Sequence, residues 1–119
     1  MKTATLAVSF FAAAVSNVGV AQTAPSAENG KVIYNKWCVY CHGAVAPAEG
    51  PGALPGTSAL SVKYKGRLPA VLEERTDLAS EFIRAVVRGG LFGMPITRKT
   101  EINDAELADV IAYLTGEKQ

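Results

Sequence analysis

The chain of 119 residues contains few of the side chains on which catalytic and metal sites usually depend. It has a single histidine, two cysteines and two methionines, so no second imidazole is present to act as a general base. It contains no P-loop, dinucleotide fingerprint or zinc pattern. Its 12 basic and 11 acidic residues nearly balance, which argues against nucleic acid as the partner.

The two cysteines and the histidine lie together in Cys38-Val39-Tyr40-Cys41-His42, the attachment pattern of a covalent c-type haem. Each thiol adds across one vinyl group of the porphyrin, so the two sulfurs must lie about one helical turn apart. The histidine then comes beneath the iron, where a neutral imidazole can bind it. We therefore expect Cys38, Cys41 and His42 to hold one haem c. A thioredoxin-like dithiol and a structural disulfide are the alternatives, but neither needs the histidine.

The second candidate ligand of the iron is Met94, the only methionine besides Met1. It lies between Gly93 and Pro95, in a loop that can carry a soft thioether to the open face of the iron. The expected iron site is therefore His42 on one side and Met94 on the other. A methionine that fills a gap in the core is one alternative. Lysine, tyrosine or water as the sixth ligand is another.

The first residues have the pattern of a secretory signal peptide. Lys2 precedes an apolar run over residues 6–15, and residues 19–21 are small, as a signal peptidase requires. The run is shorter than the roughly 20 apolar residues of a bilayer span, although an uncleaved anchor is the alternative. We expect a signal peptide at 1–21 and one cytochrome c domain at 22–119, which has 98 residues and no membrane span. Because haem c is assembled outside the cytoplasm in bacteria, the expected location is the periplasm.

The mature chain is expected to be all-α. Ser26 can cap a first helix, whose apolar residues recur at helical spacing and lead directly into the haem motif. The glycines and prolines of Gly43–Gly56 indicate a loop without regular structure. The backbone carbonyl of Pro51 or of Pro55 is a candidate to accept a hydrogen bond from the second ring nitrogen of the axial histidine. Plain stiffening of the loop is the alternative for either proline.

Two helices are expected in the middle of the chain. Pro69 stands at a plausible first position of a short helix that continues through Arg75. A longer helix starts between Asp77 and Ser80 and stops at Gly89-Gly90. The buried face of this longer helix is expected to consist of Phe82, Ile83, Val86 and Val87, and to form core and haem wall.

The last helix begins with a capping box at Asn103 and ends at Gly116. Its buried stripe is expected to be Leu107, Val110, Ile111 and Leu114. Since Gly30 has no side chain, the last helix can cross the first one closely there, with Tyr34 and Tyr113 packed around the crossing.

These features together resemble the small class I c-type cytochromes. The shared features are the haem motif at the end of a first helix, Met94-Pro95 in a late loop, and Val110-Ile111-Ala112-Tyr113-Leu114 in the final helix. The resemblance covers the whole mature chain. It implies a small class I cytochrome c fold around one covalently attached haem, with electron transfer through an exposed haem edge.

The chain also resembles, more narrowly, the cytochrome subunit of p-cresol methylhydroxylase and related flavocytochromes. The segments that carry this likeness include Pro55-Gly56-Thr57, Lys63-Tyr64-Lys65-Gly66, residues 68–78, Met94-Pro95 and Arg98-Lys99-Thr100-Glu101. In that family, the cytochrome is paired with an FAD subunit that oxidises 4-alkylphenols and passes electrons one at a time to the haem. The resemblance implies such a flavoprotein dehydrogenase as the partner.

The sequence therefore predicts an electron carrier and not an enzyme, because an iron with both axial positions filled has no place for substrate. A freely diffusing shuttle to a respiratory oxidase is the alternative within this class. A haem enzyme or gas-binding protein would need Met94 away from the iron, and a dithiol oxidoreductase would carry no haem.

Ten basic residues lie from Lys31 to Lys99, and this excess favours a basic face that docks an acidic redox partner. The candidate stretches are Lys63-Tyr64-Lys65-Gly66 and Arg98-Lys99. Ordinary solvated surface is the alternative for both stretches.

Overall fold

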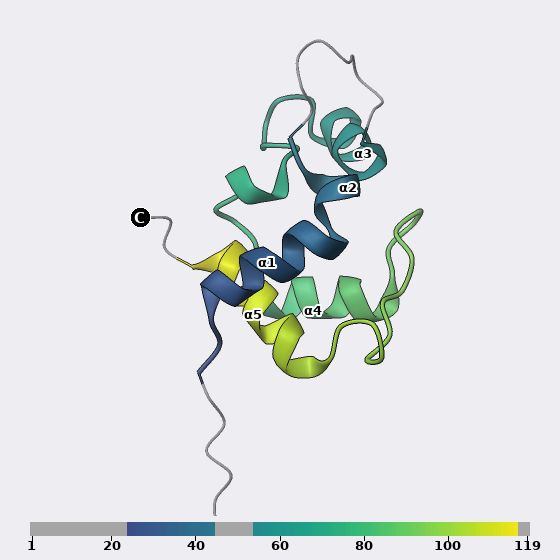
Figure 1. The fold of residues 1–119 in the computed structure, drawn as a ribbon. Coiled ribbons are helices and arrows are strands. Elements are labelled where there is room, and N and C mark those ends of the chain that lie inside the picture. The colour runs from purple at the N-terminus through teal and green to yellow at the C-terminus, as the bar shows by residue number, and fades with distance from the viewer. Residues whose placement is uncertain (1–23, 45–53, 117–119) are drawn as a thin grey trace, which may run out of the picture.

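The computed structural model describes residues 24–44 and 54–116, which fold into helices joined by loops (Figure 1). In chain order the elements are α1 (Ala27–Trp37), α2 (Val39–His42), α3 (Pro55–Tyr64), the 3-10 helix η1 (Leu72–Glu74), α4 (Ser80–Gly89) and α5 (Asp104–Thr115). Only an isolated bridge between Leu91 and Met94 departs from this helical pattern in the described residues. The all-α prediction is confirmed.

Two sequence predictions concern a signal peptide and the absence of a membrane span. The expected signal peptide at residues 1–21 lies outside the described residues. Within the described part, none of the helices has both the length and the apolar character needed to cross a bilayer.

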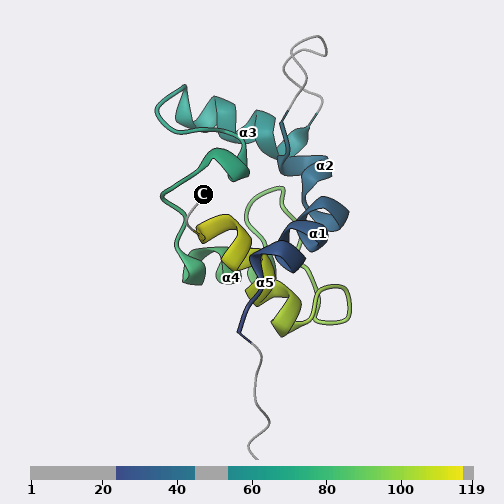
Figure 2. The same cartoon turned by 60° about the vertical axis from the view of Figure 1, so that its left-hand side comes forward.

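The first and last helices cross at Gly30, as the sequence predicts. A Cβ atom at this position would lie only 2.0 Å from the backbone oxygen of Asp109 in α5. The rings of Tyr34 and Tyr113 pack beside the crossing with their centroids 5.6 Å apart. Figures 1 and 2 show α1, α4 and α5 together below α2 and α3. This crossing forms the centre of the protein core, where Tyr34 and Leu107 are the largest fully buried side chains.

The ends of these two helices are also as predicted. Ser26 caps α1 by accepting a hydrogen bond from the Asn29 amide on its side-chain oxygen at 3.2 Å. Asn103 and Glu106 form the capping box of α5, which ends with Gly116 as its C-cap. The four residues expected for the buried stripe of α5 are all buried. Local capping signals and helical periodicity therefore located both helices correctly.

The third helix has no counterpart in the sequence predictions. The loop expected over Gly43–Gly56 in fact gives way to α3 at Pro55, after Leu54 in an extended conformation. Pro55 occupies the first helical turn, where its missing N–H costs nothing and its fixed φ favours the helix. The helix ends at Lys65, which has a left-handed φ of 50°. The sequence does not reveal where this helix starts, because the prolines and glycines around Pro55 are also typical of loops.

The short helix expected over Pro69–Arg75 is wrong. Only the single 3-10 turn η1 forms there, and Val71 and Arg75 on its two sides are extended. Arg75 is buried with its guanidinium over the ring of Tyr64 in α3, so a tertiary contact opposes the local helical preference of this segment.

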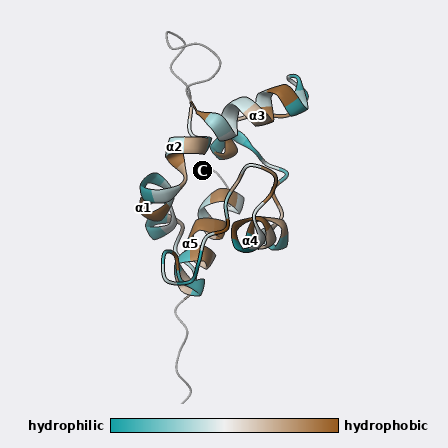
Figure 3. Ribbon diagram, turned by 90° about the vertical axis from the view of Figure 1, so that its right-hand side faces the viewer, coloured by the Kyte–Doolittle hydropathy of each residue, from teal (hydrophilic) through white to brown (hydrophobic). Residues whose placement is uncertain are grey.

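The fourth helix begins at Ser80 and ends with Gly90 as its C-cap, in agreement with the sequence prediction. Ile83 is buried, and Val86 and Val87 are partly buried. Phe82, by contrast, is 52% exposed, so the expectation that it is buried is wrong. It lines a cavity, which agrees with the other expectation for this face, that it forms a wall as well as core. In Figure 3, brown apolar segments alternate with teal hydrophilic segments along α3, α4 and α5.

Candidate functional site

A cavity of about 490 Å³ lies among the helices and is lined mainly by apolar side chains. Its wall comes from the end of α1, from α2, α3 and α4, from the turn after α4, and from α5. Cys38, Cys41, His42 and Met94 all lie along this wall. The structure thus brings together the four residues that the sequence predicts as the cofactor site.

The two cysteines lie at the start of α2 and within it. Cys38 is the residue between the two helices, and its carbonyl accepts the amides of Cys41 at 3.0 Å and His42 at 2.9 Å. Both cysteines are free thiols. Burial, followed by the nearby Cys41, raises the pKa of the Cys38 thiol to about 11. A redox-active dithiol needs a lowered pKa, so this environment disfavours the dithiol-oxidoreductase alternative.

The imidazole of His42 is held in an apolar environment. Burial lowers its pKa, which keeps the ring neutral and able to bind a metal. The ring packs against Gly56 of α3, where a Cβ atom would lie 2.6 Å from the Cε1 atom of His42. Its buried Nδ1 atom has no hydrogen-bond partner in the described part of the chain. The carbonyl of Pro55 therefore does not accept the expected bond, and the other candidate, Pro51, lies outside the described residues.

The methionine reaches the cavity from a tight turn that follows α4. Leu91 and Met94 exchange two backbone hydrogen bonds, of 3.2 and 2.9 Å, across this turn. The chain then returns to α4, where the Thr97 amide donates to the carbonyl of Val87 at 2.8 Å. Arg88 donates from Nη1 to the Thr97 carbonyl at 3.0 Å. The position of Met94 is therefore set by backbone bonds on both sides of it.

A polar cluster in the cavity wall has no sequence signal. Arg75, only 5% exposed, donates from Nε to Oδ1 of Asp77 at 2.6 Å and from Nη2 to Oδ2 at 2.5 Å. Its guanidinium lies 4.6 Å from the ring centroid of Tyr64, and Nζ of Lys63 lies 5.3 Å from the same centroid. The hydrogen bond with Asp77 raises the pKa of Arg75, and in return lowers the pKa of the Asp77 carboxyl. Lys63 thus adds a positive charge to an otherwise apolar wall, while the charge of Arg75 is largely balanced by Asp77.

These side chains fit a c-type haem. Two thiols and an imidazole lie on one short turn, and a thioether from a separate element lines the same cavity. The wall is apolar enough for a porphyrin, while Lys63 and Arg75 suit the carboxylates that a haem carries. In residues 24–44 and 54–116, no cluster of three histidine, cysteine or acidic side chains is placed to hold a metal ion by itself.

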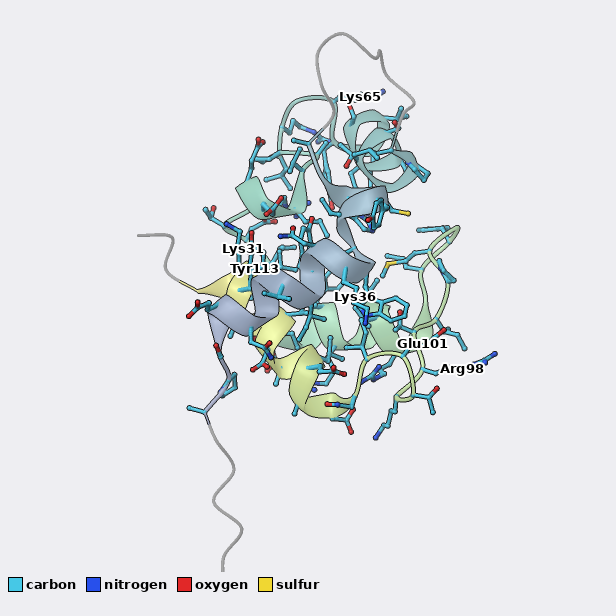
Figure 4. All side chains as sticks on the ribbon, viewed as in Figure 1. Lys31, Lys36, Lys65, Arg98, Glu101 and Tyr113 are labelled. Atoms are coloured by element: carbon cyan, nitrogen blue, oxygen red, sulfur yellow. The ribbon has the colours of Figure 1, made fainter. Side chains whose placement is uncertain are left out.

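The two basic stretches predicted for docking do not form one face. Lys65 and Arg98 lie at opposite ends of the molecule (Figure 4). Lys99 is paired with Asp104 at 2.6 Å, so its charge is largely balanced. Of the two stretches, only the one that contains Lys63 also borders the cavity.

The comparisons with known proteins gave one match. The family model described as "Cytochrome C oxidase, cbb3-type, subunit III" matches residues 25–114, from just before α1 to the next-to-last residue of α5. No curated protein and no solved structure matched the chain.

Proposed function

Since the chain belongs to the family of cytochrome c oxidase, cbb3-type, subunit III, and is a c-type cytochrome domain for electron transfer by covalently bound haem c, we propose that it carries one such haem and transfers single electrons in the periplasm. The observation that supports this most strongly is the presence of Cys38, Cys41, His42 and Met94 on one apolar cavity. When bound, the haem supplies an iron that accepts and gives up one electron.

Each of the four side chains has a separate role in this proposal. The sulfurs of Cys38 and Cys41 would attach the porphyrin and so hold it beside the histidine. His42 would bind the iron through its neutral imidazole. Met94 would supply the second ligand, and a neutral thioether favours the reduced iron and raises the reduction potential. The apolar wall would keep water from the iron, and Lys63, with the Asp77-paired Arg75, would bind the porphyrin carboxylates.

The ligand pair decides between an electron carrier and an enzyme. If His42 and Met94 were both ligands, the iron would have no free position for peroxide, substrate or a diatomic gas. A haem enzyme or gas-binding protein requires Met94 to leave the iron. The backbone bonds that hold the Leu91–Met94 turn oppose such a movement.

The Met94→Ala variant tests this proposal directly. We expect the oxidised variant to lose the charge-transfer band of methionine-bound iron, to have a lower reduction potential, and to bind carbon monoxide when reduced. Ile96→Ala is the matched control, because Ile96 lies in the same loop and is 55% exposed. An unchanged visible spectrum in Met94→Ala would refute methionine ligation.

For the electron donor, we propose a flavoprotein dehydrogenase of the kind that oxidises 4-alkylphenols. The support is the likeness to flavocytochrome subunits, together with the basic residues Lys63 and Lys65 at and beside the cavity. A flavin-containing chain that co-purifies from the native host would support this donor. Reversal of charge in Lys65→Glu should slow reduction by that chain and weaken its salt dependence, whereas Arg98→Glu, at the far end of the molecule, should not. Equal effects of the two variants would contradict the docking assignment.

Delivery of electrons to a respiratory oxidase is a second candidate, and the description of the matching family favours it. The two candidates differ in which reaction of the protein can be measured: its reduction by a flavoprotein, or its oxidation by an oxidase. Reduced protein that is rapidly oxidised by oxidase-containing membranes, but is not reduced by a flavoprotein, would identify the oxidase pathway. Location can be tested separately, because cleavage after Ala21 would leave Gln22 as the first residue of protein isolated from the periplasm.

A further inference from the structure

The helix that carries Cys41 and His42 is too short to be stable alone. α2 has only four residues, Val39–His42, and one turn of helix fixes several backbone angles for very few hydrogen bonds. The last carbonyls of any helix also lack partners within the helix itself. The position of His42 must therefore be stabilised by contacts from neighbouring elements.

One such contact comes from α1. Tyr34 is completely buried, and its hydroxyl donates to the backbone carbonyl of His42 at 3.1 Å. The same ring packs against Tyr113 of α5 and lines the cavity. Tyr34 therefore ties the backbone of the proposed iron ligand to the core at the contact between α1 and α5.

A second contact comes from α3, on the other side of the same turn. Thr57 is 6% exposed, and its hydroxyl donates to the carbonyl of Gly43 at 2.8 Å. The same oxygen lies 3.4 Å from the carbonyl of Cys41, and since a hydroxyl has one proton, the shorter contact is the main bond. The adjacent Gly56 packs on the His42 ring, so α3 limits both the backbone and the ring.

We propose that the hydroxyls of Tyr34 and Thr57 form a clamp on the last turn of α2 and act as positioning residues that set the orientation of His42 toward the haem iron. The inference rests on the proposed function, because it concerns the ligand of that haem. Two helices reach the turn from different sides and bind carbonyls at successive residues, His42 and Gly43. Loss of either hydroxyl leaves a carbonyl that is at least partly buried without its partner.

The variants Tyr34→Phe and Thr57→Val test the clamp in haem-loaded protein. Each removes one hydroxyl and keeps the shape of the side chain. We expect the amide hydrogens of His42 and Gly43 to exchange about two- to tenfold faster, the range that loss of one hydrogen bond gives. The NMR signals of the axial histidine ring and the reduction potential should shift in the same variants.

Two controls separate positioning from general stability. Tyr113→Phe removes a neighbouring hydroxyl that bonds Glu73 and does not contact α2. Thr115→Val removes a hydroxyl that donates to the Ile111 carbonyl at 2.7 Å, far along the chain from the site. Both should leave amide exchange at His42 and Gly43, and the reduction potential, as in the wild type.

The outcomes distinguish the clamp from the proposed function. If haem-loaded Tyr34→Phe and Thr57→Val had lower melting temperatures but wild-type exchange at His42 and wild-type potential, the two residues would be structural only and the clamp would be refuted. Wild-type protein that carried no covalent haem, after production in cells able to mature cytochromes, would instead overturn the proposed function itself.

Discussion

Replacement of Gly30 by alanine tests the contact between α1 and α5 on which the fold depends. A Cβ atom there would lie 2.0 Å from the backbone oxygen of Asp109, 2.5 Å from its carbonyl carbon and 2.9 Å from Cβ of Tyr113. These atoms belong to the backbone or are attached directly to it, so no side-chain rotation can relieve the contact. Because a normal carbon–oxygen contact is about 3.3 Å, the two helices would have to separate by roughly 1.3 Å.

The expected change in the free energy of unfolding follows from the contacts that this separation disturbs. Asp109 accepts bonds from the Ser26 amide at 2.7 Å and from Nδ2 of Asn29 at 2.5 Å, and both bonds span the crossing. Overpacking of a core costs about 1–3 kcal/mol, and a lost hydrogen bond adds about 1 kcal/mol. The better helix propensity of alanine returns about 1 kcal/mol. We therefore expect Gly30→Ala to lower the free energy of unfolding by about 2 kcal/mol, and the melting temperature by roughly 8–16 °C.

Thermal unfolding of the haem-loaded protein, followed by circular dichroism, measures this change. Gly89→Ala is the matched control, because Gly89 is also helical and a Cβ there meets no described atom within 4 Å. The control should raise the free energy of unfolding by up to about 1 kcal/mol, or leave it unchanged. If Gly30→Ala melted at or above the wild-type temperature, the reasoning about the close crossing would be wrong.

Three further predictions concern stability. Asn103→Ala should destabilise the protein by about 1 kcal/mol in chemical denaturation, because two amides of the first turn of α5 lose their acceptor. Arg88→Met should cost about 2 kcal/mol, since two backbone carbonyls lose their donor; equal loss in Arg84→Met, an exposed residue of the same helix, would argue against this cause. Arg75 lowers the pKa of Asp77 in the folded state, so this pair stabilises the fold above the unfolded pKa of about 4 and is lost as the pH falls below it. Asp77→Asn should therefore reduce the dependence of the unfolding free energy on pH below about 4, and an unchanged acid profile would contradict it.

Sequence alone was sufficient where a signal is local. Ser26 and Asn103 mark the starts of α1 and α5 because a capping side chain bonds amides two or three residues away. Gly30 marks the crossing because only a residue without a side chain permits that approach. These features depend on few neighbours in the chain, so a single sequence reveals them.

Sequence was insufficient where tertiary contacts decide. Pro55 starts a helix that composition alone describes as a loop, because proline is common in both contexts. The segment that ends at Arg75 has helical residues, but the buried guanidinium packs on Tyr64 of α3 and only one 3-10 turn forms. Phe82 has the spacing of a core residue, yet it lines the cavity. The same limit applies to the cavity itself: spacing predicts which residues bind a cofactor, but the wall around them is set by packing.

Tyr34, which the sequence patterns treat as core alone, links the core to the candidate site by a hydrogen bond. Gly30 brings α5 against α1, and this approach fixes Tyr34 between the two helices. The hydroxyl of Tyr34 then reaches the carbonyl of His42, so the position of the ligand depends on the crossing one turn earlier in α1. A change at Gly30 should therefore disturb both the melting temperature and the environment of His42, whereas a change at Asn103 should affect stability alone. The two variants should differ because Gly30 lies one turn from Tyr34, which bonds His42, whereas the described bonds of the Asn103 cap stay within α5.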